Sequence, residues 1–236
     1  MQWARSLHLP RICTVPRQGF YLAVIDQQLR LCRAGMATEH GLVTDLDSAD
    51  IRRRIAAGRR QPLARALGLH RRPDISVLDT TCGLGRDSAV LAGLGCRLTA
   101  IERHPGLYAL LADALRRADA QALAWRHNWR ELYHADALPW LTQSGSTRVY
   151  DAIYIDPMFD NTRRKARPQR ALQWLAELVG ADTDAAAVLA VARQKARRRV
   201  VVKSHSRAAP LAPPDHQIGG KGLRFDVYVS ASKSCK

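Results

Sequence analysis

The chain has 236 residues, 47% of them hydrophobic, which suits one large domain or one domain with a small appendage. Its 37 basic and 21 acidic residues give a formal net charge of +16, which favours a polyanionic partner such as a nucleic acid. No apolar run reaches the about 18 residues that span a bilayer, and no cysteines or histidines show metal-ligand spacing, so neither a membrane nor a metal is expected. The five cysteines form no C-x-x-C pair, which indicates a reduced, cytoplasmic protein.

Residues 1–70 are predicted to form a small basic subdomain that contains β structure and helix. The apolar run 20–25 predicts a strand, and the alternating residues 29–33 predict a second one. Residues 41–46 are a candidate for a third strand. Residues 49–69 are predicted to be helical, and within them 62–67 form a helix that stops at Gly68.

Residues 71–236 are predicted to form the main domain, in which strands and helices alternate. The predicted strands are 75–79, 96–101, 131–134, 151–155, 200–202 and 225–229. The predicted helices are 87–94, 107–118, 171–179 and 185–196. Such alternation is typical of an α/β fold with a mostly parallel sheet and helices on both faces, and the last strand is expected to be antiparallel.

A glycine-containing turn follows the first of these strands and indicates a cofactor site. Gly83 and Gly85 let the backbone approach a ligand closely, and Glu102, 23 residues after Asp79, stands where an acid binds ribose hydroxyls. A dinucleotide and S-adenosylmethionine (SAM) both use this layout. Asp87 stands where the diphosphate of a dinucleotide would lie, and its negative charge would repel that group. The same charge suits the cationic methionine end of SAM. The sequence therefore favours a methyltransferase over an NAD-dependent oxidoreductase.

Asp156, Pro157 and Phe159 follow the strand 151–155, at the end of a parallel strand where ligands bind. The carboxylate can accept a hydrogen bond from an exocyclic amine, proline fixes the turn, and the ring offers a face to an extruded base. This set suits chemistry on the amino group of a nucleobase; the alternative is an ordinary turn, since Asp-Pro is common there. Asp136 likewise has two interpretations, an acceptor for the adenine amino group or the N-cap of a helix.

Clusters of basic residues are candidate contacts with RNA phosphates. The alternative is that they are solvated surface charges. The candidates are Arg52, Arg53, Arg54, Arg163, Arg164, Lys165, Lys203 and Lys221.

Several stretches together resemble the bacterial ribosomal RNA small subunit methyltransferase J family, class I enzymes that make N2-methylguanine in 16S ribosomal RNA. The matching stretches are 78–87, 94–97, 102–103, 154–159, 200–203 and 221–228. The stretch 77–85 also resembles motif I of class I methyltransferases, in which Thr81 replaces the usual first glycine. Within the methyltransferase J family two departures occur: Cys82-Gly83 replaces the usual Ala-Gly, and 50–68 fits only loosely.

The resemblance implies a Rossmann-like seven-stranded sheet, SAM as cofactor, and 16S ribosomal RNA or the small ribosomal subunit as partner. The SAM contacts that it implies are Arg86, Asp87, Glu102, Arg103, Asp136, Ala137 and Asp156, beside Asp79, Gly83 and Gly85 of the turn. Asp156 and the Pro157 carbonyl would hold the amino group of guanine, and Phe159 would stack on the base. Two alternatives stay open: a methyltransferase for the amino group of adenine or cytosine, and a non-catalytic RNA-binding protein with a vestigial methyltransferase fold.

Overall fold

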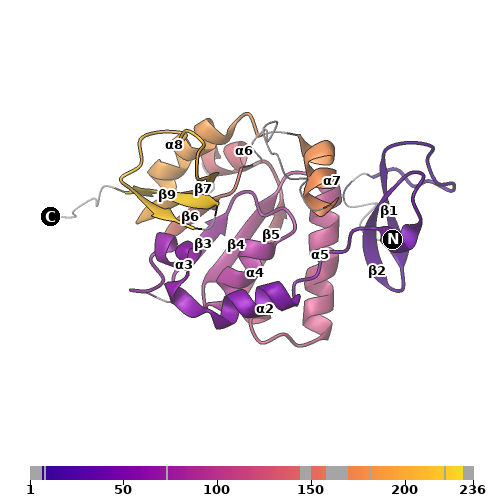
Figure 1. The fold of residues 1–236 in the computed structure, drawn as a ribbon, viewed down its shortest axis with the longest axis horizontal. Coiled ribbons are helices and arrows are strands. Elements are labelled where there is room, and N and C mark those ends of the chain that lie inside the picture. The colour runs from indigo at the N-terminus through magenta and orange to yellow at the C-terminus, as the bar shows by residue number, and fades with distance from the viewer. Residues whose placement is uncertain are drawn as a thin grey trace.

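The computed structural model describes residues 7, 9–72, 74–143, 150–157, 170–180, 182–220 and 222–230. At its centre is a seven-stranded sheet in the order β5-β4-β3-β6-β7-β9-β8, shown in Figure 1. Strands β3 to β7 run parallel, and β9 and β8 are antiparallel. The strands are β3 (Ser76–Asp79), β4 (Arg97–Glu102), β5 (Trp129–His134), β6 (Ala152–Ile155), β7 (Arg199–His205), β8 (His216–Gly219) and β9 (Leu223–Val229). The predicted α/β class, with its antiparallel last strand, is confirmed.

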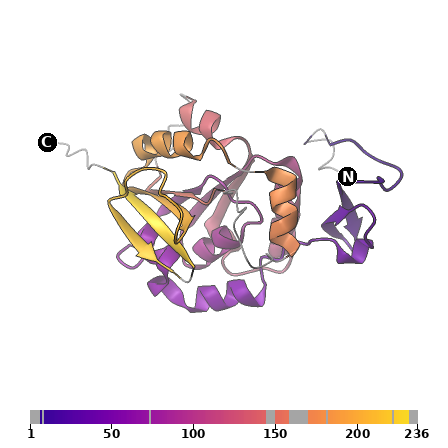
Figure 2. The ribbon, with the colours of Figure 1, turned by 45° about the horizontal axis from the view of Figure 1, so that its top comes forward.

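Helices cover both faces of this sheet, because alternate residues of each central strand point to opposite sides. Val77, Tyr154 and Val201 pack in one apolar cluster with α2 to α5, while Leu78 and Ile153 pack in another with α6 and α8. Figure 2 separates these layers, with α8 above the sheet and α2 below it. The helices are α2 (Ala49–Ala56), α3 (Pro62–Leu67), α4 (Arg86–Gly93), α5 (Pro105–Ala120), α6 (Ala137–Thr142), α7 (Arg170–Val179) and α8 (Ala185–Lys195).

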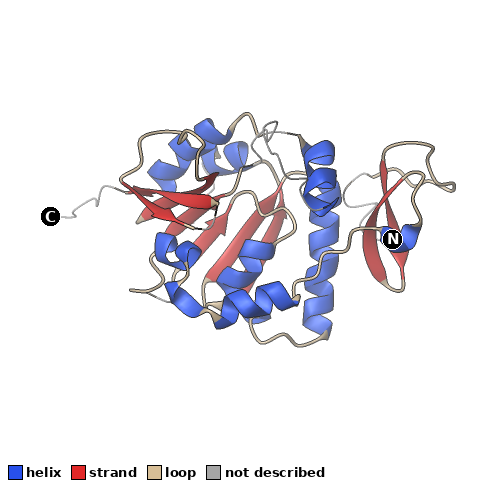
Figure 3. Cartoon of the chain, in the orientation of Figure 1, coloured by secondary structure: helices blue, strands red, loops and turns tan. Residues whose placement is uncertain are grey.

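A two-stranded antiparallel sheet, β1 (Phe20–Ile25) and β2 (Gln28–Arg33), forms the predicted N-terminal β subdomain. It lies beyond α5 and α7 at one end of the molecule (Figure 3). The β2 backbone N–H of Leu29 donates to Asp113 of α5, and Phe20 contacts Trp174 of α7 with 5.6 Å between ring centroids. Leu29, Leu31, Leu107 and Leu110 share an apolar cluster with Trp174, so the hairpin packs on α5 and α7 through a cluster separate from the two that cover the faces of the large sheet.

Two details differ from the sequence-based expectations. Residues 41–46 form no strand, because only Leu42 pairs with Leu31, as an isolated bridge, before a turn in which the Asp45 carboxylate accepts from the Asp47 N–H. Strand β8 was not predicted. The domain boundary at residue 70 stays a prediction; α2 and α3 pack in the same apolar cluster as the large sheet. Among the described residues, no helix is both long and apolar enough to cross a membrane.

Candidate functional site

The carboxyl ends of the parallel strands bring the main polar side chains together. Asp79 ends β3, Glu102 ends β4, and Asp156 directly follows β6. The register aligns these ends, since Asp79 lies opposite Tyr154 of β6, and Ile155 lies opposite Val202 of β7. Lys203 is therefore beside Asp156 on the next strand. This edge of the sheet is where ligands bind in open α/β folds.

The turn between β3 and α4 has a left-handed backbone at both of its glycines, Gly83 and Gly85. Gly85 has φ 71° and precedes the first residue of α4; a Cβ there would lie 2.6 Å from Leu111 Cδ1 and 3.0 Å from Trp129 Cη2. Gly83 has φ 55°, and a Cβ there would meet no atom within 4 Å. Gly85 thus lets the turn pack against α5 and β5, whereas Gly83 borders open space that a ligand can occupy.

Two threonines attach this turn to the end of β6. The N–H and hydroxyl of Thr80 both donate to the Tyr154 carbonyl, each at 3.0 Å. The N–H of Asp156 donates to Thr81 Oγ1 at 2.7 Å. Thr81, which stands where related motifs have glycine, therefore supplies a hydroxyl that fixes the backbone of Asp156.

Asp87, in the first turn of α4, is surrounded by three donors. Arg54 of α2 donates to its Oδ1 at 2.5 Å, while Tyr154 Oη and Lys203 Nζ approach its Oδ2 at 2.6 and 2.9 Å. Lys203 Nζ also lies 2.8 Å from Asp156 Oδ2. Arg54, Asp87, Lys203 and Asp156 thus form a chain of alternating charges, in which Lys203 bridges the two acids.

The environment shifts the pKa values of this group in opposite directions. Burial alone would raise the pKa of Asp87, but the Lys203 ammonium and Arg54 guanidinium outweigh burial and hold it well below its usual range. Burial raises the pKa of Asp156, and Lys203 only partly opposes this effect. Burial would lower the pKa of Lys203, but the two carboxylates raise it. The lysine therefore stays charged, and Asp156 is the stronger proton acceptor of the two acids.

Asp79 and Glu102 are the most buried acids of this edge. Burial raises the pKa of Asp79 to about 7, although the Ser88 hydroxyl and the Thr81 N–H donate to it. Glu102 accepts from the backbone N–H of Gly83 at 2.8 Å and of His104 at 2.7 Å, and burial still raises its pKa. Asp79 thus holds the turn together, while Glu102 is fixed against the Gly83 side of it.

This arrangement fits an adenosine cofactor with a cationic amino-acid end. Each Glu102 oxygen accepts one backbone N–H and keeps a lone pair for a ribose hydroxyl. The first-turn N–H groups of α4 can receive a carboxylate. Asp136 takes the N-cap position of α6, but its side chain makes no capping hydrogen bond, so the N-cap interpretation accounts for its position and not for its carboxylate. Asp136 is exposed and Ala137 beside it is buried.

Other predicted contacts have different partners in the structure. Arg86 pairs with Asp50 of α2 at 2.8 Å, and Arg103 pairs with Asp182 and Asp184. Their contacts with SAM, like the contact of Lys203 with RNA, stay predictions. Arg52 and Arg53 are exposed on α2. Pro157 is buried at the end of β6. Five predicted residues lie outside the described part of the chain: Phe159, Arg163, Arg164, Lys165 and Lys221.

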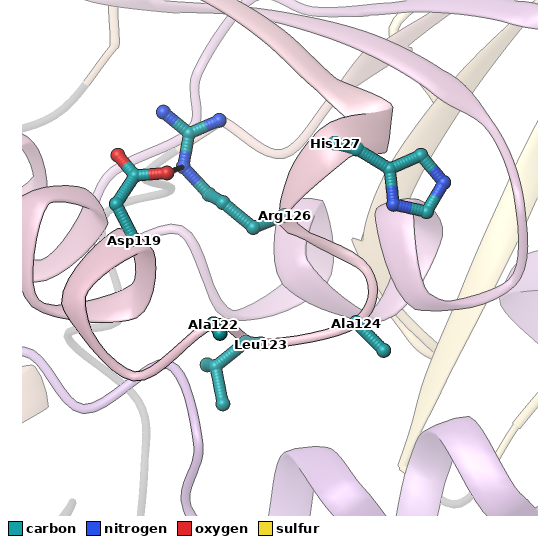
Figure 4. Close-up of a pocket in the computed structure, with 6 residues that line it drawn as sticks. All are labelled: Asp119, Ala122, Leu123, Ala124, Arg126 and His127. Atoms are coloured by element: carbon teal, nitrogen blue, oxygen red, sulfur yellow. Dashed lines mark ion pairs between the residues drawn. The ribbon is translucent and has the colours of Figure 1, made fainter.

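A shallow pocket of about 370 Å³ lies elsewhere, between the end of α5 and β5 (Figure 4). Asp119 and Arg126 form an ion pair of 3.1 Å at its side, and Ala122, Leu123, Ala124 and His127 complete its lining. It adjoins the amino end of β5, whereas the acids gather at the carboxyl ends of the strands. This pocket is therefore separate from the candidate site.

Sequence reasoning missed the parts that Arg54, Thr81 and Tyr154 play in the site. Tyr154 had a usable signal, because strand alternation in 150–155 and 200–203 predicts that Tyr154 and Lys203 share one face of the sheet. Arg54 had none, since it is 33 residues from Asp87 and belongs to a helix that precedes the sheet.

Comparisons with known proteins identify the family of this chain. Residues 3–230 match the family described as "Putative SAM-dependent methyltransferase". Ribosomal RNA small subunit methyltransferase J of Halorhodospira halophila is 41% identical over 235 residues, which cover 96% of this chain and 87% of the relative. The enzyme of the same name from Thioalkalivibrio sulfidiphilus is 45% identical over 179 residues, 73% of this chain and 69% of the relative.

A solved structure shows the same fold over the whole chain. The crystal structure of a SAM-dependent methyltransferase from Neisseria gonorrhoeae superposes with a TM-score of 0.75 at 30% identity, covering 100% of this chain and 93% of that one. The chain therefore belongs to the SAM-dependent methyltransferases, in the family of ribosomal RNA small subunit methyltransferase J.

Proposed function

We propose that this enzyme transfers a methyl group from SAM to the exocyclic N2 of a guanine in 16S ribosomal RNA. The observation that carries the proposal is the position of Asp156, whose carboxylate follows β6 beside the glycine turn and is held by Lys203 at 2.8 Å. The relatives' name supports small-subunit ribosomal RNA as the substrate. The net charge of +16 suits a polyanionic partner, either the naked RNA or the small subunit, in the bacterial cytoplasm where ribosomes are made.

In the proposed site, Glu102 holds the ribose of the cofactor, and Asp136, with Ala137 beside it, lies near the adenine. Asp87 and the first turn of α4 receive the methionine end, while Gly83 leaves room for it. When bound, SAM supplies an electrophilic methyl group, and the electrons of the broken bond stay on sulfur.

Asp156 and the carbonyl of Pro157 accept hydrogen bonds from the two amino protons, and Phe159 stacks on the base. The amino nitrogen loses one proton as it gains the methyl group. Asp156 can take this proton, because burial raises its pKa.

The product of the reaction tests the proposal. Small subunits from cells that lack the protein are incubated with the purified enzyme and methyl-labelled SAM, and the nucleosides are identified by mass spectrometry. We expect N2-methylguanosine. N6-methyladenosine or N4-methylcytidine would assign the enzyme to another base, and labelled SAM that fails to bind would indicate a vestigial fold.

The Asp156→Asn variant tests the acceptor. We expect turnover to fall by about 10²–10⁴-fold, the usual contribution of a positioned acid or base, and by a larger factor than the cofactor affinity measured by calorimetry. Asp119→Asn is the matched control, because Asp119 lies in the pocket at the far end of α5. Near-normal turnover of Asp156→Asn would remove this residue from the chemistry.

A further inference from the structure

Lys203 lies between the two acids of the site, Asp87 and Asp156. In β7, Val200 and Val202 pack with α6 and α8, whereas Val201 packs on the opposite side of the sheet. Strand alternation therefore places Lys203 on the side of α4, where Asp87 lies. Its side chain is 25% exposed, and its ammonium lies 2.9 Å from Asp87 Oδ2 and 2.8 Å from Asp156 Oδ2.

The two carboxylates use their oxygens differently. Asp87 Oδ2 accepts from both Tyr154 and Lys203, and its Oδ1 accepts from Arg54, so this acid is engaged through both oxygens. Asp156 is held through Oδ2 by Lys203 and through its backbone N–H by Thr81. Among the described residues, Asp156 Oδ1 has no hydrogen-bond partner, so this oxygen is left to accept from a substrate.

We propose that Lys203 is a positioning residue for methyl transfer, which fixes the Asp156 carboxylate through Oδ2 so that Oδ1 is oriented to accept from the amino group of the base. This inference rests on the proposed function. Lys203 keeps its own proton throughout the reaction. The proton that leaves the amino nitrogen passes to Asp156 and from there to water.

The charges around Asp156 predict the direction in which its pKa changes when Lys203 is removed. The charged and titratable groups around Asp156 are Asp79 of β3, Asp87 of α4, Tyr154 of β6, Lys203 of β7 and Asp182 before α8, and Arg54 of α2 pairs with Asp87. Burial, Asp87 and Asp182 all raise the pKa of Asp156, and Lys203 is the cation that opposes them. Without Lys203 the carboxylate protonates at higher pH and can no longer accept a hydrogen bond through an ionised oxygen.

The experiment compares Lys203→Met, which keeps the aliphatic stem, with Lys203→Arg, which keeps the charge. Lys195→Met is the control, since it removes the same charge at the end of α8. Carbon-13 NMR follows the titration of the Asp156 carboxyl, assigned by its loss in Asp156→Asn. The pH profile of kcat/KM is measured on small subunits with the same proteins.

We expect the Asp156 titration in Lys203→Met to move up by about 1–3 pH units, the usual effect of one nearby opposite charge. The acidic limb of the kcat/KM profile should move up with it, so that activity recovers at high pH. Lys203→Arg should restore most of both properties, and Lys195→Met should change neither.

An unchanged titration in Lys203→Met would overturn the inference. So would a loss of activity by the same factor at every pH, because that pattern reports a structural role. If the titration moves but the wild-type enzyme methylates no RNA, the proposed function fails, while the electrostatic action of Lys203 on Asp156 stands.

Discussion

At the scale of single residues, Gly83 and Gly85 serve the cofactor turn in different ways. Both have a left-handed backbone, which costs a residue with a Cβ about 1–2 kcal/mol. At Gly85 a Cβ would also collide with Leu111 and Trp129, but at Gly83 it would extend into open space. The first glycine thus leaves room for a ligand, and the second allows close packing.

Alanine at each position should separate these contributions. We expect Gly83→Ala to lose about 1–2 kcal/mol of unfolding free energy in urea and to bind SAM more weakly in calorimetry. Gly85→Ala should be less stable than Gly83→Ala by about 1–3 kcal/mol because of overpacking. Equal stability of the two variants would show that Leu111 and Trp129 move aside without cost, and unchanged SAM affinity of Gly83→Ala would move the ligand away from this turn.

At the scale of elements, helix α2 connects the basic surface with the site. The side chains of Arg52 and Arg53 are 61% and 77% exposed, and each pairs with an acid of the same region, Asp47 or Asp50. Arg54, 27% exposed, points the other way and donates to Asp87. One short run of arginines therefore combines a candidate RNA contact with a structural ion pair.

Arg53→Ala and Arg54→Ala should consequently affect different measurements. We expect Arg54→Ala to lose about 1–3 kcal/mol of stability, because Asp87 is left with fewer donors, and Arg53→Ala to stay within about 0.5 kcal/mol of wild type. Arg53→Ala should instead reduce the slope of log affinity for RNA against log salt by about 0.7–0.9. If both variants changed only the salt slope, the contact between Arg54 and Asp87 would contribute no stability.

At the scale of the whole molecule, the buried acids make stability depend on pH. Asp79 is 2% exposed, and its pKa rises from 3.8 to about 7 on burial. Between these values the folded protein binds the proton and the unfolded chain releases it, so Asp79 favours folding below pH 4 and loses this contribution as the pH rises to about 7.

The Asp79→Asn variant isolates this effect, since Asn keeps an oxygen for the Thr81 N–H but does not titrate. We expect the unfolding free energy of wild type minus that of the variant to decrease with rising pH, by at most about 1.4 kcal/mol per pH unit. Urea unfolding from pH 4 to 8 measures this difference. A difference that is constant over this range would place the Asp79 pKa near its ordinary value.

The sequence predicted those parts of the molecule whose signals are local. Apolar runs such as 151–155 gave the buried strands, and the rule that ligands bind at strand ends pointed to Asp79, Glu102 and Asp156. Strand β8 was not predicted because residues His216–Gly219 are mostly polar and exposed. They form a strand only by pairing with β9. Residues 41–46, the candidate third strand, form none because a strand needs a partner along its length, and of these residues only Leu42 has one.

Within the site, strand-end acids were predictable, but their partners were not. The contact of Lys203 with Asp87 joins residues 116 positions apart, and that of Arg54 with Asp87 spans 33. No local pattern encodes such distances. Which oxygen of Asp156 is engaged depends on side-chain geometry that only the folded chain defines.

The course of α2 has a practical consequence for shortening this protein. Ser48 caps this helix by accepting the N–H of Ile51, and Ile51 is completely buried in the core that α2 shares with α4. A fragment that began at the first strand of the large sheet would expose that patch of α4 and deprive Asp87 of its arginine. A minimal catalytic unit therefore has to start ahead of Ser48, well upstream of the point where the Rossmann-like pattern first becomes visible.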